Sequence, residues 1–525
     1  MSNDKKSKIY LLPIGLCCFM AIGIWIGHSL SGKQKSSSKV NDIIEVINKN
    51  YVDKVDGEKL FEETISEMLH KLDPHSNYIS PKDMKALTEQ IQGEFGGIGV
   101  RFTLLRDTIC VTNVIPGSPS QEAGVLAGDK IIAINKKSVA SKKITNDKVM
   151  TLLKGLSNTS VEVTLWRNER KLNKTLVRGT IPIASIPCAI MTTKNIGYVK
   201  IDQFSVTTAQ EFKDQTQKLL DLGMKSMILD LRNNGGGVLQ TAVEIVDEFL
   251  KDGETIVSTK GANVKKEVFK ASIIGKLERI PLVVLINENS ASASEIVAGA
   301  LQDNDRALIL GRRSYGKGLV QKDISLQDKS NVRLTIARYY TPTGRCIQKP
   351  YTDDYEKYIN EESVRFEHGE QFRLDSSLLV DSLKFKTPKG KIVYGGGGIF
   401  PDVFLPLDTM GGSWYFTELR YSNVFQSFAF DYVSNKRSTW KNPSQFQKTF
   451  VIDEKLTQEF LKYAYKNVHI PIDPAGIAKS KRFIQTTLKA EIARQIWTEE
   501  GYYTVINELD KEMQSAIKIL EKNKK

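Results

Sequence analysis

The chain has 525 residues, of which 41% are hydrophobic and 26% are charged. This is the composition of a globular protein, which excludes a chain that is disordered throughout, and the length predicts roughly three or four domains. The net charge of +13 is spread along the chain and suits an anionic membrane surface at least as well as nucleic acid; because zinc-finger, KH and RNP motifs are absent, we expect no nucleic-acid partner.

The N-terminal segment predicts a membrane anchor. Residues 9–27 are apolar and uncharged, and Lys5, Lys6 and Lys8 precede them. About 20 apolar residues span a bilayer as a helix, and the positive flank stays in the cytoplasm. We therefore predict that residues 1–39 form a cytoplasmic tip, an anchor and a linker, and that the rest of the chain is exported to the periplasm or another extracytoplasmic space. Two alternatives stay open: a signal peptide that is cleaved near residues 28–31, giving a secreted protein, and a helix buried in the core.

Four further regions follow in chain order. Residues 40–92 show apolar positions at helical spacing. Residues 93–180 contain short alternating runs separated by turn residues, which predicts a small β-rich domain. Residues 181–405 alternate strand and helix patterns, and near-continuous Val/Ile/Leu strands predict a parallel α/β sheet that is buried on both faces. Residues 406–525 look helical, and their sequence assigns them no chemistry.

Cysteines and histidines carry no recognisable metal or disulfide framework. The five cysteines are scattered without metal-ligand spacing, and none of the five histidines belongs to an HExxH motif. We predict that the protein uses no metal or organic cofactor. If it is a hydrolase, its general base need not be histidine.

A serine-rich turn is the first candidate for chemistry. The run Ser290-Ala-Ser-Ala-Ser-Glu295 follows a buried strand and opens a helix. A serine there projects beside free backbone N–H groups and the positive end of the helix dipole, the environment that a nucleophile and its oxyanion require. The alternative is that these serines only cap the helix.

A lysine between two glycines, Gly316-Lys317-Gly318, follows the next predicted strand. Flanking glycines let the backbone approach closely, and a lysine kept neutral by burial can take the proton of a serine hydroxyl. A phosphate loop or a plain turn is the alternative, although the segment lacks the Walker spacing and the Ser/Thr after the lysine.

Together these segments resemble the carboxy-terminal processing (tail-specific) proteases, serine peptidase family S41, over roughly residues 40–405. The resemblance implies that Ser292 is the nucleophile, that Lys317 is its base, and that Gln321 orients the lysine. Further family motifs agree in type and order: Leu72–Tyr78, Asp230–Gly237, Tyr340–Gly344 and Gly398–Asp402.

The resemblance also implies an oxyanion hole. Its donors would be the backbone N–H groups of Gly236 and Ala293. The choice between Gly236 and Gly237 stays open, because Gly235 stands where the family usually has proline.

The β-rich region resembles a PDZ domain. Its carboxylate-binding loop would be Gly96, Gly97, Ile98, Gly99 and Val100. Successive N–H groups in a glycine-rich turn form an anion nest, and the following strand, residues 100–104, would offer its edge to an extended peptide. A glycine-rich hairpin without a ligand is the alternative.

We therefore predict an α/β protease core of the ClpP/crotonase-like class, at residues 181–405, with an inserted PDZ domain at 93–180, an N-terminal helical region and a helical C-terminal extension. The predicted function is an exported serine endopeptidase that cleaves proteins near their C-termini with a Ser292/Lys317 dyad. Its expected partners are the C-terminal tails of unfolded or precursor proteins and, through the anchor, a membrane. A homo-oligomer stays open, as do two rival functions: a PDZ scaffold on an inactive core, and an acyl-CoA enzyme.

Overall fold

The computed structural model describes residues 20, 22, 37–352, 354–375, 377, 379–409 and 412–522. They divide into two units, Met1–Ser80 with Ile324–Arg333, and Pro81–Asp323 with Leu334–Lys525. The predicted anchor lies outside the described residues except at positions 20 and 22. Among the helices that are described, none has both the length and the apolar character needed to cross a membrane.

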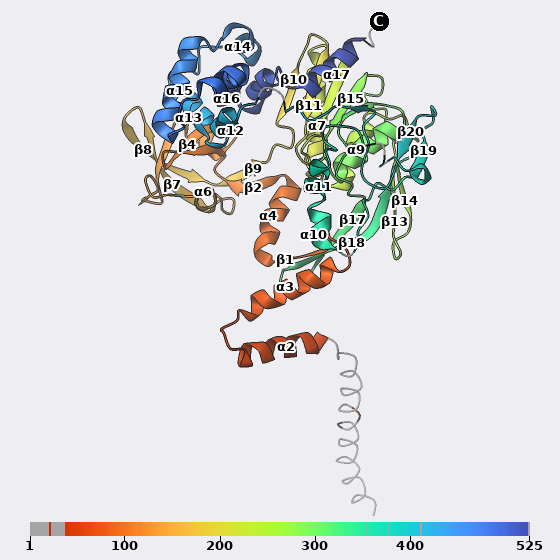
Figure 1. Ribbon diagram of the computed structural model, residues 1–525. Coiled ribbons are helices and arrows are strands. Elements are labelled where there is room, and N and C mark those ends of the chain that lie inside the picture. The colour runs from red at the N-terminus through yellow and green to blue at the C-terminus, as the bar shows by residue number, and fades with distance from the viewer. Residues whose placement is uncertain are drawn as a thin grey trace, which may run out of the picture. The chain divides into compact units, whose positions relative to one another are not determined.

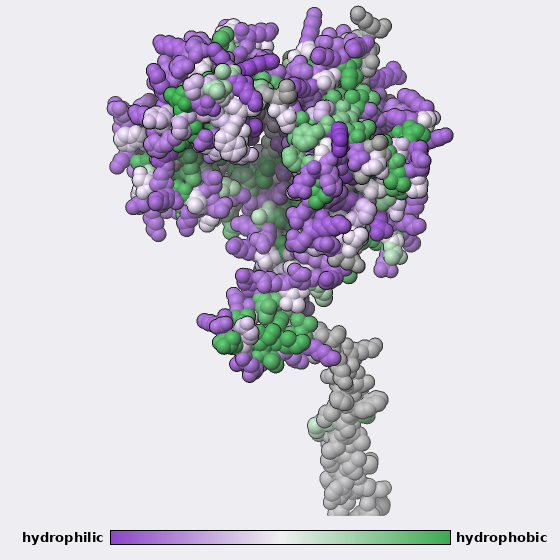
Figure 2. Space-filling model, in the orientation of Figure 1, coloured by the Kyte–Doolittle hydropathy of each residue, from purple (hydrophilic) through white to green (hydrophobic). Residues whose placement is uncertain are grey.

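The first unit contains two helices and a short strand, α2 (Ser37–Asn50), α3 (Gly57–His70) and β1 (Asn77–Ile79). Strand β1 pairs with residues 331–333 in antiparallel register. Between α3 and β1, the Asp73 carboxylate accepts the N–H groups of His75 and Ser76 and thereby closes the turn. Helices α2 and α3 carry exposed apolar side chains, Ile43, Val46 and Met68 among them. Figure 2 shows hydrophobic surface, in green, on this unit.

The second unit begins with α4 (Pro81–Gln92), which leads into a β-rich domain. The elements of this domain are β2 (Glu94–Gly97), β3 (Val100–Leu105), β4 (Thr108–Val114), α5 (Pro119–Glu122), β5 (Lys130–Ile134), β6 (Lys137–Ser138), α6 (Asn146–Leu153), β7 (Ser160–Arg167), β8 (Arg170–Val177) and β9 (Gly179–Pro182). Its main sheet has the order β3-β4-β5-β7-β8, with β6 on β5, and β2 pairs with β9. In β7, Val161, Val163 and Leu165 are buried at every second position, as the alternating sequence predicts.

A six-stranded sheet forms the centre of the second unit. Its order is β10 (Cys188–Met191), β11 (Ile196–Lys200), β12 (Ser226–Asp230), β15 (Leu282–Ile286), β16 (Leu308–Gly311) and β21 (Val403–Phe404). The strands from β11 to β21 are parallel, which confirms the sequence prediction, whereas β10 pairs antiparallel with β11. Every residue of β11, β12 and β15 is buried, because both faces of the sheet are covered.

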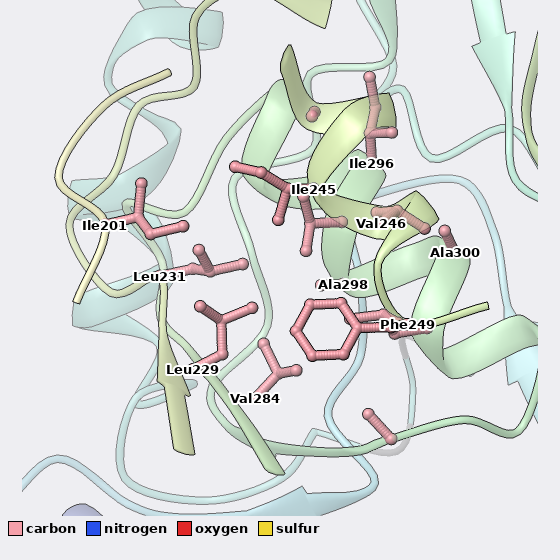
Figure 3. Close-up of a cluster of buried hydrophobic side chains, with 14 of the residues drawn as sticks. Ile201, Leu229, Leu231, Ile245, Val246, Phe249, Val284, Ile296, Ala298 and Ala300 are labelled. Atoms are coloured by element: carbon pink, nitrogen blue, oxygen red, sulfur yellow. The ribbon is translucent and has the colours of Figure 1, made fainter. Parts of the chain in front are cut away.

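Three helices cover one face of this sheet, α7 (Thr208–Asp221), α8 (Leu239–Asp247) and α9 (Ala293–Asp303). Figure 3 shows Leu229 and Val284 of the sheet pointing toward Val246 of α8 and Ala298 of α9. Near-complete burial of this cluster makes it the main hydrophobic core of the unit.

The opposite face is covered by the helix α17 (Lys511–Lys522), which Figure 1 shows beside the strands of this sheet. Met513 and Ala516 of this helix are buried in one cluster with Tyr198, Ile228 and Leu285 of the strands. The end of the predicted C-terminal extension is therefore a layer of the core.

A second sheet carries the strands β13 (Thr255–Lys260), β14 (Glu267–Lys270), β17 (Leu319–Ser325) and β18 (Asn331–Tyr340). In the second unit, β13 pairs with β14 and with residues 338–340 of β18. Smaller elements follow: α10 (Tyr355–Ile359), α11 (Glu361–Glu367), the 3₁₀ helix η2 (Asp381–Leu383), β19 (Lys384–Lys386) and β20 (Ile392–Tyr394).

The remaining helices form their own core. They are α12 (Trp414–Tyr421), α13 (Val424–Tyr432), α14 (Pro443–Thr449), α15 (Glu454–Val468) and α16 (Pro474–Ile506). This core is rich in phenylalanine, as shown by the stacked rings of Phe425 and Phe460, whose centroids are 4.6 Å apart. The bundle contacts the β-rich domain through a bidentate ion pair, in which the two terminal guanidinium nitrogens of Arg106 each donate to one carboxylate oxygen of Asp431 at 2.8 Å.

Candidate active site

Ser292 lies in the turn between β15 and α9. Its backbone has φ 54° and ψ −113°, a conformation that residues with a side chain rarely adopt. The Ser292 side chain is partly exposed, whereas Ser290 and Ser294 are fully buried. The Ser290 hydroxyl donates to the Leu231 carbonyl and the Ser294 hydroxyl to the Asn234 carbonyl, both at 2.9 Å. The flanking serines therefore tie this turn to the glycine-rich loop after β12, and Ser292 is left as the accessible hydroxyl of the three.

Lys317 lies in the loop between β16 and β17. Its amine donates to the Gln321 side-chain oxygen at 3.0 Å, the pair of residues that the family resemblance connects. The following residue is fixed as well, because the Gly318 N–H donates to the Gln348 side chain at 2.8 Å. Gln321 and Gln348 thus hold both the side chain and the backbone of this segment.

The Glu295 carboxylate joins the serine and lysine segments. One of its oxygens accepts the N–H groups of both Ser292 and Lys317, each at 2.8 Å. The other accepts the Gly316 N–H at 2.7 Å and the Ser314 hydroxyl at 2.5 Å. Glu295 is completely buried; burial raises its pKa, and the four donors oppose that rise.

Tyr339 is a second bridge between the same two segments. Its hydroxyl lies 2.6 Å from the Lys317 carbonyl and 3.1 Å from the Ser292 carbonyl. Burial raises the pKa of Tyr339 well above its ordinary value, so the phenol keeps the proton that it shares between these acceptors.

Neither bridge was predicted. The spacing Ser292-x-x-Glu295 is that of a capping box, which signals the Glu295 contact to its own helix but not the contact to Lys317. Tyr339 comes from a distant strand, and nothing in the local sequence marks it.

The glycine-rich loop 235–237 packs against the serine turn. A Cβ on Gly236 would lie 2.7 Å from the Ser292 Cβ and from the Ala291 carbonyl oxygen. In this conformation the Gly236 N–H donates to the Asn234 side chain at 2.8 Å. The N–H groups of Ala293 and Gly237 have no acceptor within the part of the chain that the structure describes.

The loop predicted to bind carboxylates spans three structural elements. Gly96 and Gly97 belong to β2, Ile98 and Gly99 form the turn, and Val100 begins β3, which lies at the edge of its sheet. The carbonyls of this turn are used: Ile98 accepts the Ser120 N–H and Gly99 accepts the Ile115 N–H, both at 2.9 Å. For the N–H groups of Ile98 and Gly99, the described residues supply no acceptor.

The described residues hold no group of three or more His, Cys, Asp and Glu side chains that could bind a metal ion. That the protein needs no cofactor stays a prediction.

Comparisons with known sequences identify the family. The chain matches the Peptidase family S41 profile over residues 195–357 and a PDZ domain profile over 96–176. Residues 27–83 match the activating protease CtpB N-terminal domain, and residues 415–498 match a family of unknown function, DUF8443.

Two curated relatives carry this match over most of their length. The carboxy-terminal-processing protease of Bartonella bacilliformis is 38% identical over 321 residues, which cover 60% of this chain and 73% of that protein. The carboxy-terminal processing protease CtpA of Bacillus subtilis is 35% identical over 349 residues, 65% of this chain and 74% of that one. A solved photosystem II D1 C-terminal processing protease is 26% identical, covering 70% of this chain and 92% of that one with a TM-score of 0.35. The chain belongs to peptidase family S41, among the carboxy-terminal processing proteases, and includes a PDZ domain.

Proposed function

We propose that the protein is a serine endopeptidase that cuts proteins near their C-termini with a Ser292/Lys317 dyad. The observation that carries the proposal is the pair of bridges between the two residues: the Glu295 carboxylate takes both backbone N–H groups, and the Tyr339 hydroxyl lies against both carbonyls. Two residues that are distant in sequence are held at one place by buried groups, which is what a reaction between their side chains requires.

The reaction has two stages. Neutral Lys317, oriented by Gln321, takes the proton of the Ser292 hydroxyl while the oxygen attacks the scissile carbonyl. The lysine then gives that proton to the leaving amine, and an acyl-enzyme forms. In the second stage Lys317 takes a proton from water, the hydroxide attacks the acyl group, and Ser292 regains its proton.

The oxyanion would be held by backbone N–H groups at the start of α9 and in the glycine-rich loop. The Ala293 N–H is the first donor, since it opens the helix and has no acceptor among the described residues. The second is the Gly236 N–H, which would exchange the Asn234 side chain for the oxyanion. A charged acceptor forms the stronger hydrogen bond, so substrate favours this exchange.

The PDZ domain would select the substrate. A free C-terminal carboxylate would bind the N–H groups of Ile98 and Gly99, and the tail would add as a strand to β3. We further propose that the chain is exported and held by its N-terminal apolar segment, with secretion after cleavage as the alternative. The parallel sheet between helical layers supports the ClpP/crotonase-like assignment of the core.

The test uses the full chain and an unfolded reporter protein with an apolar C-terminal tail, in one form with a free carboxylate and in another with a carboxamide. Mass spectrometry of the fragments should locate the cuts near the C-terminus, and the carboxamide form should show a raised KM. Equal KM for the two tails would refute the role of the PDZ loop. Binding of the tail without any cleavage would favour the scaffold function instead.

A further inference from the structure

Two carboxylates at the start of α17, Asp510 and Glu512, pair with the arginines that follow strands β12 and β16. Asp510 precedes the helix, caps it through the Met513 N–H at 3.0 Å, and also pairs with Arg232 at 2.7 Å. Glu512 pairs with Arg232 at 2.9 Å and, through its other oxygen, with Arg312. The side chains of both arginines and of Glu512 are at most 15% exposed, so water screens these pairs little.

Arg232 lies in the segment that connects β12 to the glycine-rich loop 235–237. Its guanidinium binds both oxygens of Asp230, at 2.9 and 2.6 Å, in addition to the two carboxylates at the start of α17. Burial works against the charge of Arg232, but these carboxylates outweigh it and raise its pKa. The guanidinium is therefore fixed from two sides, by its own strand and by the C-terminal helix.

Arg312 begins the loop that carries Lys317. Its Nε donates to Glu288 at 2.8 Å, and Glu288 lies in the turn that leads to Ser292. Glu512 thus contacts the lysine loop directly and the serine turn through one arginine.

We propose that Asp510 and Glu512 are positioning residues for the protease reaction. Through Arg232 and Arg312, this clamp at the start of α17 would hold three segments of the candidate site in fixed positions: 231–238, 286–292 and 312–318. The inference rests on the function proposed above. It gives the end of the C-terminal extension a role in catalysis, beyond covering the sheet. Neither carboxylate touches the reacting atoms, so the effect must pass through Arg232 and Arg312.

The clamp can be weakened without removing the helix. Met513 and Ala516 hold α17 on the sheet through apolar contacts that do not involve Asp510 or Glu512. Asparagine caps a helix as well as aspartate does, so Asp510→Asn keeps the cap and removes the charge. Glu512→Gln likewise keeps the shape of the side chain.

The experiment compares the full-length wild type with Asp510→Asn, Glu512→Gln and the double variant. The matched control is Glu521→Gln, the same substitution on the same helix at an exposed position. For cleavage of the tailed reporter we expect kcat to fall at least tenfold in each clamp variant, with KM unchanged, because tail binding is remote from the clamp. Hydrogen–deuterium exchange should accelerate severalfold in segments 231–238, 286–292 and 312–318, and should not change in the strands of the PDZ domain.

A clamp variant with the kcat of the wild type would overturn the inference. So would faster exchange throughout the second unit together with a lowered Tm, since that result assigns the carboxylates to general stability. A wild type that does not cleave the reporter would contradict the proposed function alone, because the exchange measurement tests the clamp without any activity.

Discussion

Ser292 has a backbone conformation that costs free energy, and the surrounding contacts hold it there. Its N–H is taken by Glu295 and its carbonyl lies against Tyr339, so both of its backbone polar groups are engaged by buried side chains. Residues with such strained backbones concentrate at functional sites, where the structure around them supplies the stabilisation.

Replacing Glu295 by glutamine should weaken the link between the Ser292 and Lys317 segments. The amide has one accepting oxygen instead of two, so some of the four donors lose their acceptor. Each buried donor left unsatisfied should lower the free energy of unfolding by roughly 1–3 kcal/mol. We expect kcat/KM to fall roughly a hundredfold, because small displacements of reacting groups are costly. Cleavage assays and thermal unfolding would measure both effects, with the exposed Glu244→Gln of α8 as the control. Full activity in Glu295→Gln would contradict the bridging role.

Gly236 should tolerate no side chain. Its φ is +100°, and a Cβ would meet the Ser292 Cβ at 2.7 Å, so Gly236→Ala must move Ser292 or the loop. We expect loss of cleavage by at least a hundredfold with tail binding retained. The matched control is Gly235→Ala, where a Cβ has no neighbour within 4 Å. Equal loss in both variants would show that the loop, and not this contact, is the sensitive feature.

Site residues could be predicted from the sequence where they belong to short motifs, in which the residues are close together along the chain. Short motifs predicted Ser292, Lys317 and Gln321 as candidates, and the Lys317 amine donates to the Gln321 side chain in the structure. The Tyr339 bridge could not be found, because it depends on how β18 crosses the loops. The occupied N–H of Gly236 is a choice of hydrogen-bond acceptor that no sequence pattern specifies.

At the scale of the elements, the sequence predicted those whose burial pattern is distinctive. Continuous apolar runs gave the parallel strands β11, β12, β15 and β16, and alternation gave the strands of the β-rich domain. Antiparallel β10 and the position of α17 were not predicted. Both depend on contacts between segments that are distant in sequence. The hydrophobic pattern of a helix shows that one of its faces is buried, but not which sheet it packs against.

The contact between the β-rich domain and the helical bundle should depend on pH. Burial raises the pKa of Asp431, but hydrogen bonds from Arg106 and Tyr463 outweigh it, and the folded-state pKa lies below the ordinary value. A lowered carboxyl pKa contributes stability above the unfolded-state pKa of about 3.9, and that stability is lost as pH falls through the folded value.

Denaturation of wild type and Asp431→Asn from pH 3 to 8 would measure this contribution. We expect a difference of less than about 1 kcal/mol, because both side chains are partly exposed, constant above pH 5 and shrinking as the solution becomes more acidic. A difference that grows toward low pH would have the wrong sign for this pair.

At the largest scale, the second unit is completed by its C-terminal helix, because α17 forms the layer opposite α8 and α9. Met513 is fully buried in that layer, whereas Lys518 of the same helix is exposed. We expect Met513→Ala to lower the free energy of unfolding by about 2–5 kcal/mol, as large-to-small core substitutions do. Lys518→Ala should change it by less than about 0.5 kcal/mol. Chemical denaturation checks both, and equal small effects would show that α17 packs loosely on the sheet.

The most direct test of the central claim is cleavage of the tailed reporter by the full chain, by Ser292→Ala and by Lys317→Ala, with binding of the tail measured in parallel. We predict that the wild type cuts the reporter, that neither variant does, and that all three bind the tail equally. Cleavage by Lys317→Ala at the wild-type rate, or by Ser292→Ala at all, would contradict the dyad.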